Sequence, residues 1–279
     1  MNQNTQSTTP ENVQITSRRP AFNFEGTPVI WLGDPIKTHF MNALSVLIPY
    51  SEKAVIEVMR KNLDQIQDSV LKQEISSLIK QEGAHAFMHR QTNSLLVDCG
   101  YGKITVFEKI QKVMMSLLAR CSSKAFEMAM PAAFEHFTAA ISRDFLAHQS
   151  YWTHGQKNQG IEFTKWHALE EMEHQAVCYD AFKALYKNPY RLSLLLILVW
   201  LPIFTISTFT IQLYFLHKDR VIYKPKYWPK YICFLGRSTR LFSKGIFDYA
   251  KPSFSPWSKS DLSLYQQSLH QQNLDRFKK

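Results

Sequence analysis

Two short motifs with the same spacing, a glutamate followed three residues later by a histidine, constrain this chain more than any other feature. The first is Glu82 with His85, and the second is Glu171 with His174. On a helix, residues three apart share a face, so each motif presents a carboxylate beside an imidazole. His167 precedes Glu171 by four positions and therefore falls on the same face. Such a face is either a metal-binding face or an unusually polar core stripe.

Two further glutamates complete the pattern. Glu52 and Glu135 each lie in an apolar stretch upstream of one of the motifs. The order resembles the di-metal carboxylate site of ferritin-like bundles, in which two helices each give one glutamate and two give a Glu-x-x-His pair. The separations are 30 positions from Glu52 to Glu82, 53 from Glu82 to Glu135 and 36 from Glu135 to Glu171. They fit short, long and short connections between antiparallel helices, and predict an all-α, ferritin-like four-helix bundle with a crossover helix.

The pattern predicts two metal ions held by carboxylates and imidazoles. The expected ligands are Glu52, Glu82, His85, Glu135, His167, Glu171 and His174. His89 and Glu170 are expected to contact these ligands, and the sequence leaves open whether His89 or His167 binds a metal directly. The donor mixture suits iron, with manganese or zinc as alternatives, better than a thiolate or calcium site. The alternative without metal is a set of helical charge pairs.

The bundle is expected over residues 24–190, after a polar segment, residues 1–23, whose composition predicts disorder. Asp34 as N-cap and Pro35 at the first helical position predict a helix over residues 35–62. The further helices are expected over residues 65–96, 104–120, 124–151 and 161–185, with residues 104–120 forming the crossover.

The rest of the chain has two parts of different composition. Residues 191–217 contain an uncharged stretch, residues 192–216, long enough to span a bilayer. Basic residues flank it on both sides and Pro202 lies near its middle. We therefore expect a membrane-associated segment of two short arms dipping into one leaflet, with a buried fifth bundle helix or a plain span as alternatives.

The C-terminal part, residues 218–279, is a basic and aromatic tail. It contains 13 Lys and Arg against 4 Asp and Glu, and so accounts for most of the net charge of +10. Aromatic and basic residues beside an apolar segment favour a membrane surface as partner over nucleic acid. A homodimer stays open.

Cysteine usage and the N-terminal sequence predict the compartment. The four cysteines form no C-x-x-C pair, and the polar N-terminus lacks an apolar signal core. Both indicate a reducing environment. We expect a cytoplasmic protein at the inner face of a membrane.

From about Trp31 to Trp257 the chain resembles the family of predicted metal-dependent hydrolases, which is ferritin-like. The resemblance rests on the motifs around Glu52, Glu82, Glu135 and Glu171 described above, together with the tail segment 248–257. The family tail usually reads Arg-Pro-Gly-Phe-His-Pro-Trp. In this chain Lys251, Ser253 and Ser255 replace its Arg, Gly and His, so a role for that histidine does not carry over.

A narrower resemblance concerns the last motif. His167-x-x-x-Glu171-x-x-His174 is similar to the p-aminobenzoate N-oxygenase type of di-iron enzyme, which adds a third histidine to the usual two. His167 matches the position of that extra ligand. The resemblance implies direct coordination by His167.

These motifs predict an enzyme and leave its reaction open. The favoured interpretation is a di-iron oxygenase that oxidises a small apolar or aromatic substrate with O2 and takes electrons from a donor. The alternative is a hydrolase in which two metals activate water, as the family name implies. A further alternative is a bundle that binds metal without catalysis.

Overall fold

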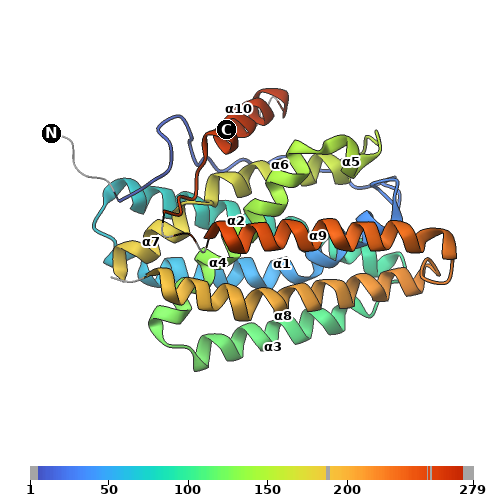
Figure 1. Ribbon diagram of the computed structural model, residues 1–279, viewed down its shortest axis with the longest axis horizontal. Helices are drawn as coiled ribbons and strands as arrows, with labels where there is room; N and C mark the ends of the chain where they lie inside the picture. The colour runs from blue at the N-terminus through green and yellow to red at the C-terminus, as the bar shows by residue number, and fades with distance from the viewer. Residues whose placement is uncertain (1–5, 187–188, 250, 252, 273–279) are drawn as a thin grey trace.

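The computed structural model describes residues 6–186, 189–249, 251 and 253–272. Within these residues the regular elements are helices, without strands, so the prediction of an all-α bundle is confirmed (Figure 1). The long helices run roughly along one axis of the molecule (Figure 1).

Four helices carry the predicted ligands. They are α1 (Pro35–Asn62), α2 (Ser69–Asp98), α4 (Lys124–Ala147) and α6 (Gln159–His174). Helix α1 packs against α2, and α4 packs against α6, while α1 also contacts α4. Helix α3 (Ile104–Cys121) makes the crossover and packs against α1. The polar donors therefore meet on the inner faces of a four-helix bundle.

Helix α1 begins at the residue that the sequence predicts. The side chain of Asp34 accepts hydrogen bonds from the backbone N–H groups of Ile36, at 2.9 Å, and Lys37, at 3.1 Å. Pro35 occupies the first helical position, where its missing N–H has no consequence. Two of the free N–H groups at the helix start are thereby satisfied.

Two of the predicted helices are interrupted. The helix expected over residues 124–151 ends at Ala147, and a short α5 (Gln149–Thr153) follows. The helix expected over residues 161–185 ends at His174, and α7 (Val177–Leu185) continues after a two-residue break. The second interruption lies directly after a predicted ligand.

The apolar segment forms α8 (Pro189–Lys218), one helix that continues through Pro202. It packs against α1 and α4, and its buried Gln212 donates a hydrogen bond of 2.8 Å to the carbonyl of Ile36. The expected pair of short arms is therefore wrong, although the side chains of residues 187–201 lie outside the described part of the chain. No helix in the described residues is both long and apolar enough to cross a membrane.

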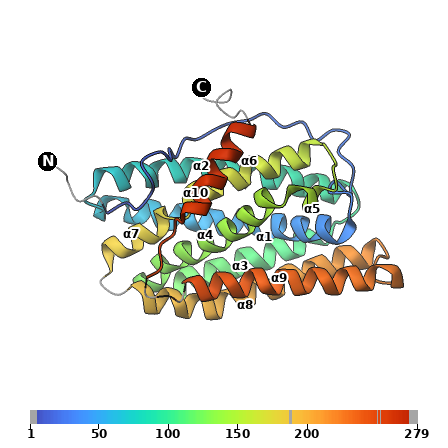
Figure 2. The same cartoon turned by 45° about the horizontal axis from the view of Figure 1, so that its top comes forward.

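The basic tail is also helical. Helix α9 (Trp228–Tyr249) runs beside α8 and packs against α4 as well. Helix α10 (Lys259–Gln272) contacts α6 and α4, and Figure 2 shows it crossing over α6. The tail thus covers the bundle on two sides.

Residues 6–34 precede α1 and contact the bundle, while residues 1–5 lie outside the described part of the chain. The backbone N–H of Thr8 donates to Asp180 at 2.6 Å, and the hydroxyl of Ser7 donates to Glu74 at 2.9 Å. Arg18 is only 1% exposed. The prediction of disorder is wrong for residues 6–23, because their polar groups bind partners on the bundle.

Candidate metal centre

All seven predicted ligands lie together in the middle of the bundle. They form two groups whose donor atoms lie within 4.8 Å of one another, and Glu171 belongs to both. The first group is Glu52, His85, His167 and Glu171, and the second is Glu82, Glu135, Glu171 and His174. Every member is buried. Two neighbouring cation positions that share one carboxylate are the arrangement expected for a dinuclear site.

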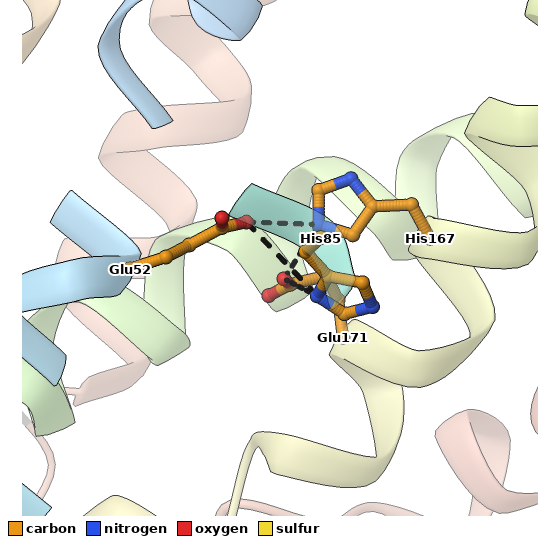
Figure 3. Close-up of side chains that lie close together, drawn as sticks. All are labelled: Glu52, His85, His167 and Glu171. Carbon is orange, nitrogen blue, oxygen red and sulfur yellow. Dashed lines mark hydrogen bonds and ion pairs between the residues drawn. The ribbon is translucent and has the colours of Figure 1, made fainter. Parts of the chain in front are cut away.

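The first group is drawn in Figure 3. His167 Nε2 lies 2.9 Å from Glu171 Oε1 and 3.5 Å from Glu52 Oε1. His85 Nδ1 lies 3.6 Å from Glu171 Oε1 and 4.0 Å from Glu52 Oε1. Two carboxylates and two imidazole nitrogens therefore converge from α1, α2 and α6.

The second group converges from α2, α4 and α6. His174 Nδ1 lies 2.8 Å from Glu82 Oε1 and 3.4 Å from Glu135 Oε2. Glu82 Oε1 also lies 3.4 Å from His85 Nδ1, which belongs to the first group. Glu82 therefore lies close to both groups, and Glu171 is a member of both, so these two carboxylates would help to hold cations at either position.

Many of these donor atoms have no hydrogen-bond partner among the described residues. Apart from the contacts that they make with one another inside the cluster, this holds for both carboxylate oxygens of Glu52, Glu82 and Glu135, Oε2 of Glu171, and Nδ1 of His85 and His174. Leaving buried polar atoms unpaired is unfavourable, and leaving buried charges unpaired is more so. Four ionised carboxylates carry a formal charge of −4, which two divalent cations would cancel. The donor set therefore fits two metal ions.

Burial and neighbouring charges divide the carboxylates into two kinds. Burial raises the pKa of Glu52 and of Glu135 well above the usual range. Burial also acts to raise the pKa of Glu82, but His174 and His85 outweigh it and hold that pKa well below the usual range. Without a cation the cluster therefore retains protons, which an arriving metal ion would displace.

The two histidines of the Glu-x-x-His motifs are held from behind. His85 Nε2 donates to Glu170 Oε2 at 2.9 Å, and His174 Nε2 donates to the side-chain oxygen of Gln81 at 2.8 Å. A proton on Nε2 leaves the lone pair of Nδ1 facing the cluster. Partners of this kind fix the tautomer and orientation of metal-binding histidines.

His89 belongs to neither group. Its Nε2 lies 3.0 Å from His167 Nδ1, and its Nδ1 lies 2.9 Å from the hydroxyl of Ser45. His89 therefore fixes the ring orientation of His167, as Glu170 fixes that of His85. Of the two histidines left open by the sequence, the structure places His167 at the cluster and His89 behind it.

Three residues around the site escaped the sequence interpretation. Gln81 Nε2 donates to Glu173 Oε2 at 2.8 Å, and the hydroxyl of Tyr265 donates to Glu173 Oε1 at 2.8 Å. Arg18 contacts Glu170 and Glu173. Gln81 could have been suspected from its place beside Glu82, whereas Arg18 and Tyr265 lie in segments with no recognisable motif.

A cavity of about 340 Å³ leads from the cluster to the surface. His167 and Glu171 line its inner part. Its walls are mainly aromatic and aliphatic, from Leu44, Ile48, Phe134, Phe137, Ile141, Phe145, Phe163 and Phe204. Its exposed lining residues, among them Pro28, Val29 and Leu95, mark the mouth. An apolar molecule of modest size can therefore reach the donor cluster.

The helical bundle and its buried donor cluster define a metal-binding protein of the all-α class. The chain belongs to the family of predicted metal-dependent hydrolases, whose family model matches residues 16–260. No curated protein and no solved structure gives a significant match. The family and the donor groups together support metal binding, while the identity of the metal is left open by both.

Proposed function

We propose that this protein is a dinuclear metal-dependent hydrolase acting on an ester or amide with an apolar body. The observation that carries the proposal is the pair of donor groups sharing Glu171 at the inner end of an apolar cavity. The expected metal ligands are Glu52, Glu82, His85, Glu135, His167, Glu171 and His174. Two divalent cations in such a site would supply an acidified water and polarise the scissile group.

The surrounding residues would bind and orient the substrate. Phe134, Phe137 and Phe163 offer apolar walls for the substrate body, and burying that surface would provide most of the binding free energy. The polar, scissile end would then face Glu171 and His167, the lining residues that belong to the donor groups. The enclosed walls would also limit access of bulk water.

The family match favours hydrolysis over the oxidation preferred on sequence grounds. Oxidation of an apolar substrate with O2 is the second candidate. It is favoured by the donor chemistry, since the two groups contain carboxylates and imidazoles and no thiolate. It would need iron and an external electron donor.

A metal-reconstitution experiment tests the first candidate. We expect about two metal ions per chain, and hydrolysis of p-nitrophenyl esters with medium-length acyl groups in the absence of O2. Iron, manganese and zinc are loaded separately. Glu171→Gln, which removes the shared ligand, is expected to lose at least one metal ion per chain and nearly all activity.

Glu162→Gln is the matched control, because Glu162 is an exposed glutamate on the same helix. It should retain metal and activity. O2 consumption by the reduced iron form, with no anaerobic ester cleavage, would establish the second candidate instead. A chain that takes up no metal would exclude both.

A further inference from the structure

Arg18 lies in the segment before α1 and is 1% exposed. Its Nη2 donates to Glu173 Oε1 at 2.7 Å, and its Nη1 donates to Glu170 Oε1 at 3.2 Å. Its backbone N–H donates to Glu170 Oε1 as well, at 3.2 Å. One guanidinium thus binds the buried carboxylates of Glu170 and Glu173, which lie three residues apart on α6.

The opposite oxygens of these two carboxylates point toward the metal centre. Glu170 Oε2 accepts the hydrogen bond from His85 Nε2, so Arg18 is two hydrogen bonds away from that imidazole. Glu173 Oε2 accepts from Gln81, whose oxygen accepts from His174 Nε2, so this second path has three hydrogen bonds. His85 belongs to one donor group and His174 to the other.

We infer that Arg18 is a positioning residue that orients His85 of one donor group and His174 of the other, and this rests on the proposed metal centre. Glu170 and Glu173 are fully buried and would repel each other if both were ionised without a cation beside them. The guanidinium satisfies both and fixes which oxygen of each remains for the inner hydrogen bonds. Each imidazole thereby keeps its proton on Nε2 and its free Nδ1 toward the cluster.

The test is cobalt binding by the full chain, followed through the visible absorption of Co²⁺. Arg18→Met removes both hydrogen bonds while retaining much of the side-chain volume. We expect Co²⁺ affinity to fall about 10- to 100-fold, as for other residues that orient metal ligands, with altered absorption bands. Arg18→Lys keeps the charge but lacks the two-pronged geometry, so it should recover part of the affinity.

Arg143→Met is the matched control. Arg143 is partly buried, and it donates to the Gln175 side chain at 2.6 Å and pairs with Asp261 at 3.6 Å. It therefore tests the general effect of removing an arginine that is hydrogen-bonded to the bundle. We expect its stability to fall while its cobalt affinity and spectrum stay as in the unmodified protein.

Wild-type affinity and spectrum in a folded Arg18→Met variant would overturn the inference. If that variant does not fold, Tyr265→Phe replaces it, because Tyr265 donates to the same oxygen of Glu173 at 2.8 Å. Tyr265→Phe should weaken Co²⁺ binding less than Arg18→Met does, and only for one of the two bound ions. An unchanged cobalt spectrum in this variant would count against the inference. Cobalt binding without hydrolysis would contradict only the proposed function, whereas no cobalt binding at all would overturn both.

Discussion

His136 follows a predicted metal ligand directly in sequence but has a different environment. Its Nε2 donates to the backbone carbonyl of Gly245 on α9 at 3.0 Å, and the side chain is buried. Burial, reinforced by the guanidinium of Arg143, lowers the pKa of His136 to about 4. The imidazole thus helps to fasten α9 to α4 in its neutral form.

The lowered pKa predicts acid destabilisation. Below pH 6.5 an unfolded chain would protonate His136 while the folded protein would not, so stability present above pH 6.5 is lost as the pH falls toward 4. The loss attributable to this residue should reach about 3 kcal/mol at most. In His136→Gln the side-chain amide can still donate a hydrogen bond to the carbonyl of Gly245. The free energies of unfolding of the wild type and of this variant, measured in urea, should therefore converge as the pH falls from 7 to 4.5.

The exposed His270 provides the control, since His270→Gln should leave the pH dependence as it is. A His136→Gln variant that loses stability with acid as steeply as the wild type would contradict the assignment.

At the scale of single residues, the clustering of the candidate ligands was predictable from the sequence, and the residues that support them only partly so. Glu82 and His85 share a face of any helix that contains them, and the repeat of this spacing at Glu171 and His174 is what identifies them as candidate ligands. Arg18 and Tyr265 contact Glu173 across 155 and 92 positions of the chain. No local pattern encodes such contacts, because they depend on how whole segments pack.

Among the helices, α1 has a clear local determinant at its N-terminus. Asp34 caps it through two backbone N–H groups. Asp34→Ala should lower the free energy of unfolding by about 1 kcal/mol, as for other N-cap residues. Asp34→Asn keeps a capping oxygen and should restore most of the stability in the same chemical-denaturation measurement. Equal losses in the two variants would show that the carboxylate acts through its charge instead.

The interruptions of the longer helices were not predictable from periodicity. After α6 the side chain of Gln175 accepts a hydrogen bond from Arg143 on α4, a tertiary contact in the break between α6 and α7. Composition likewise misjudged residues 6–23, whose polar side chains pair with groups on α2, α6 and α7. The hydropathy of residues 192–216 could not distinguish a membrane-associated segment from a buried bundle helix, because lipid and protein core both exclude water.

The molecule as a whole carries an apolar stripe on the outside of α3. Val106, Ile110, Val113 and Leu117 are each more than half exposed and recur at helical spacing. The exposed Lys109 lies among them in sequence. Apolar side chains beside basic ones are typical of a helix that lies on an anionic lipid surface. Binding to a membrane surface, expected from the sequence, stays a prediction that this stripe makes testable.

Co-sedimentation with lipid vesicles checks this prediction. Vesicles containing phosphatidylserine should bind the protein more tightly than neutral phosphatidylcholine vesicles, and added salt should weaken the binding. The double variant Ile110→Ser and Val113→Ser should reduce binding at least tenfold, while Val70→Ser, at an exposed apolar position on α2, should have no effect. Self-association abolished by the double variant would instead mark α3 as a contact between two copies.

The long-range contacts of Glu173 have a consequence for the order of folding. Its partners Arg18 and Tyr265 lie on opposite sides of it in the chain, 155 and 92 positions away. Closing such long loops is slow compared with forming local helix pairs. A refolding chain would therefore assemble helix pairs before Arg18 and Tyr265 fix the carboxylate of Glu173. Metal present during refolding and metal added afterwards need not produce the same centre.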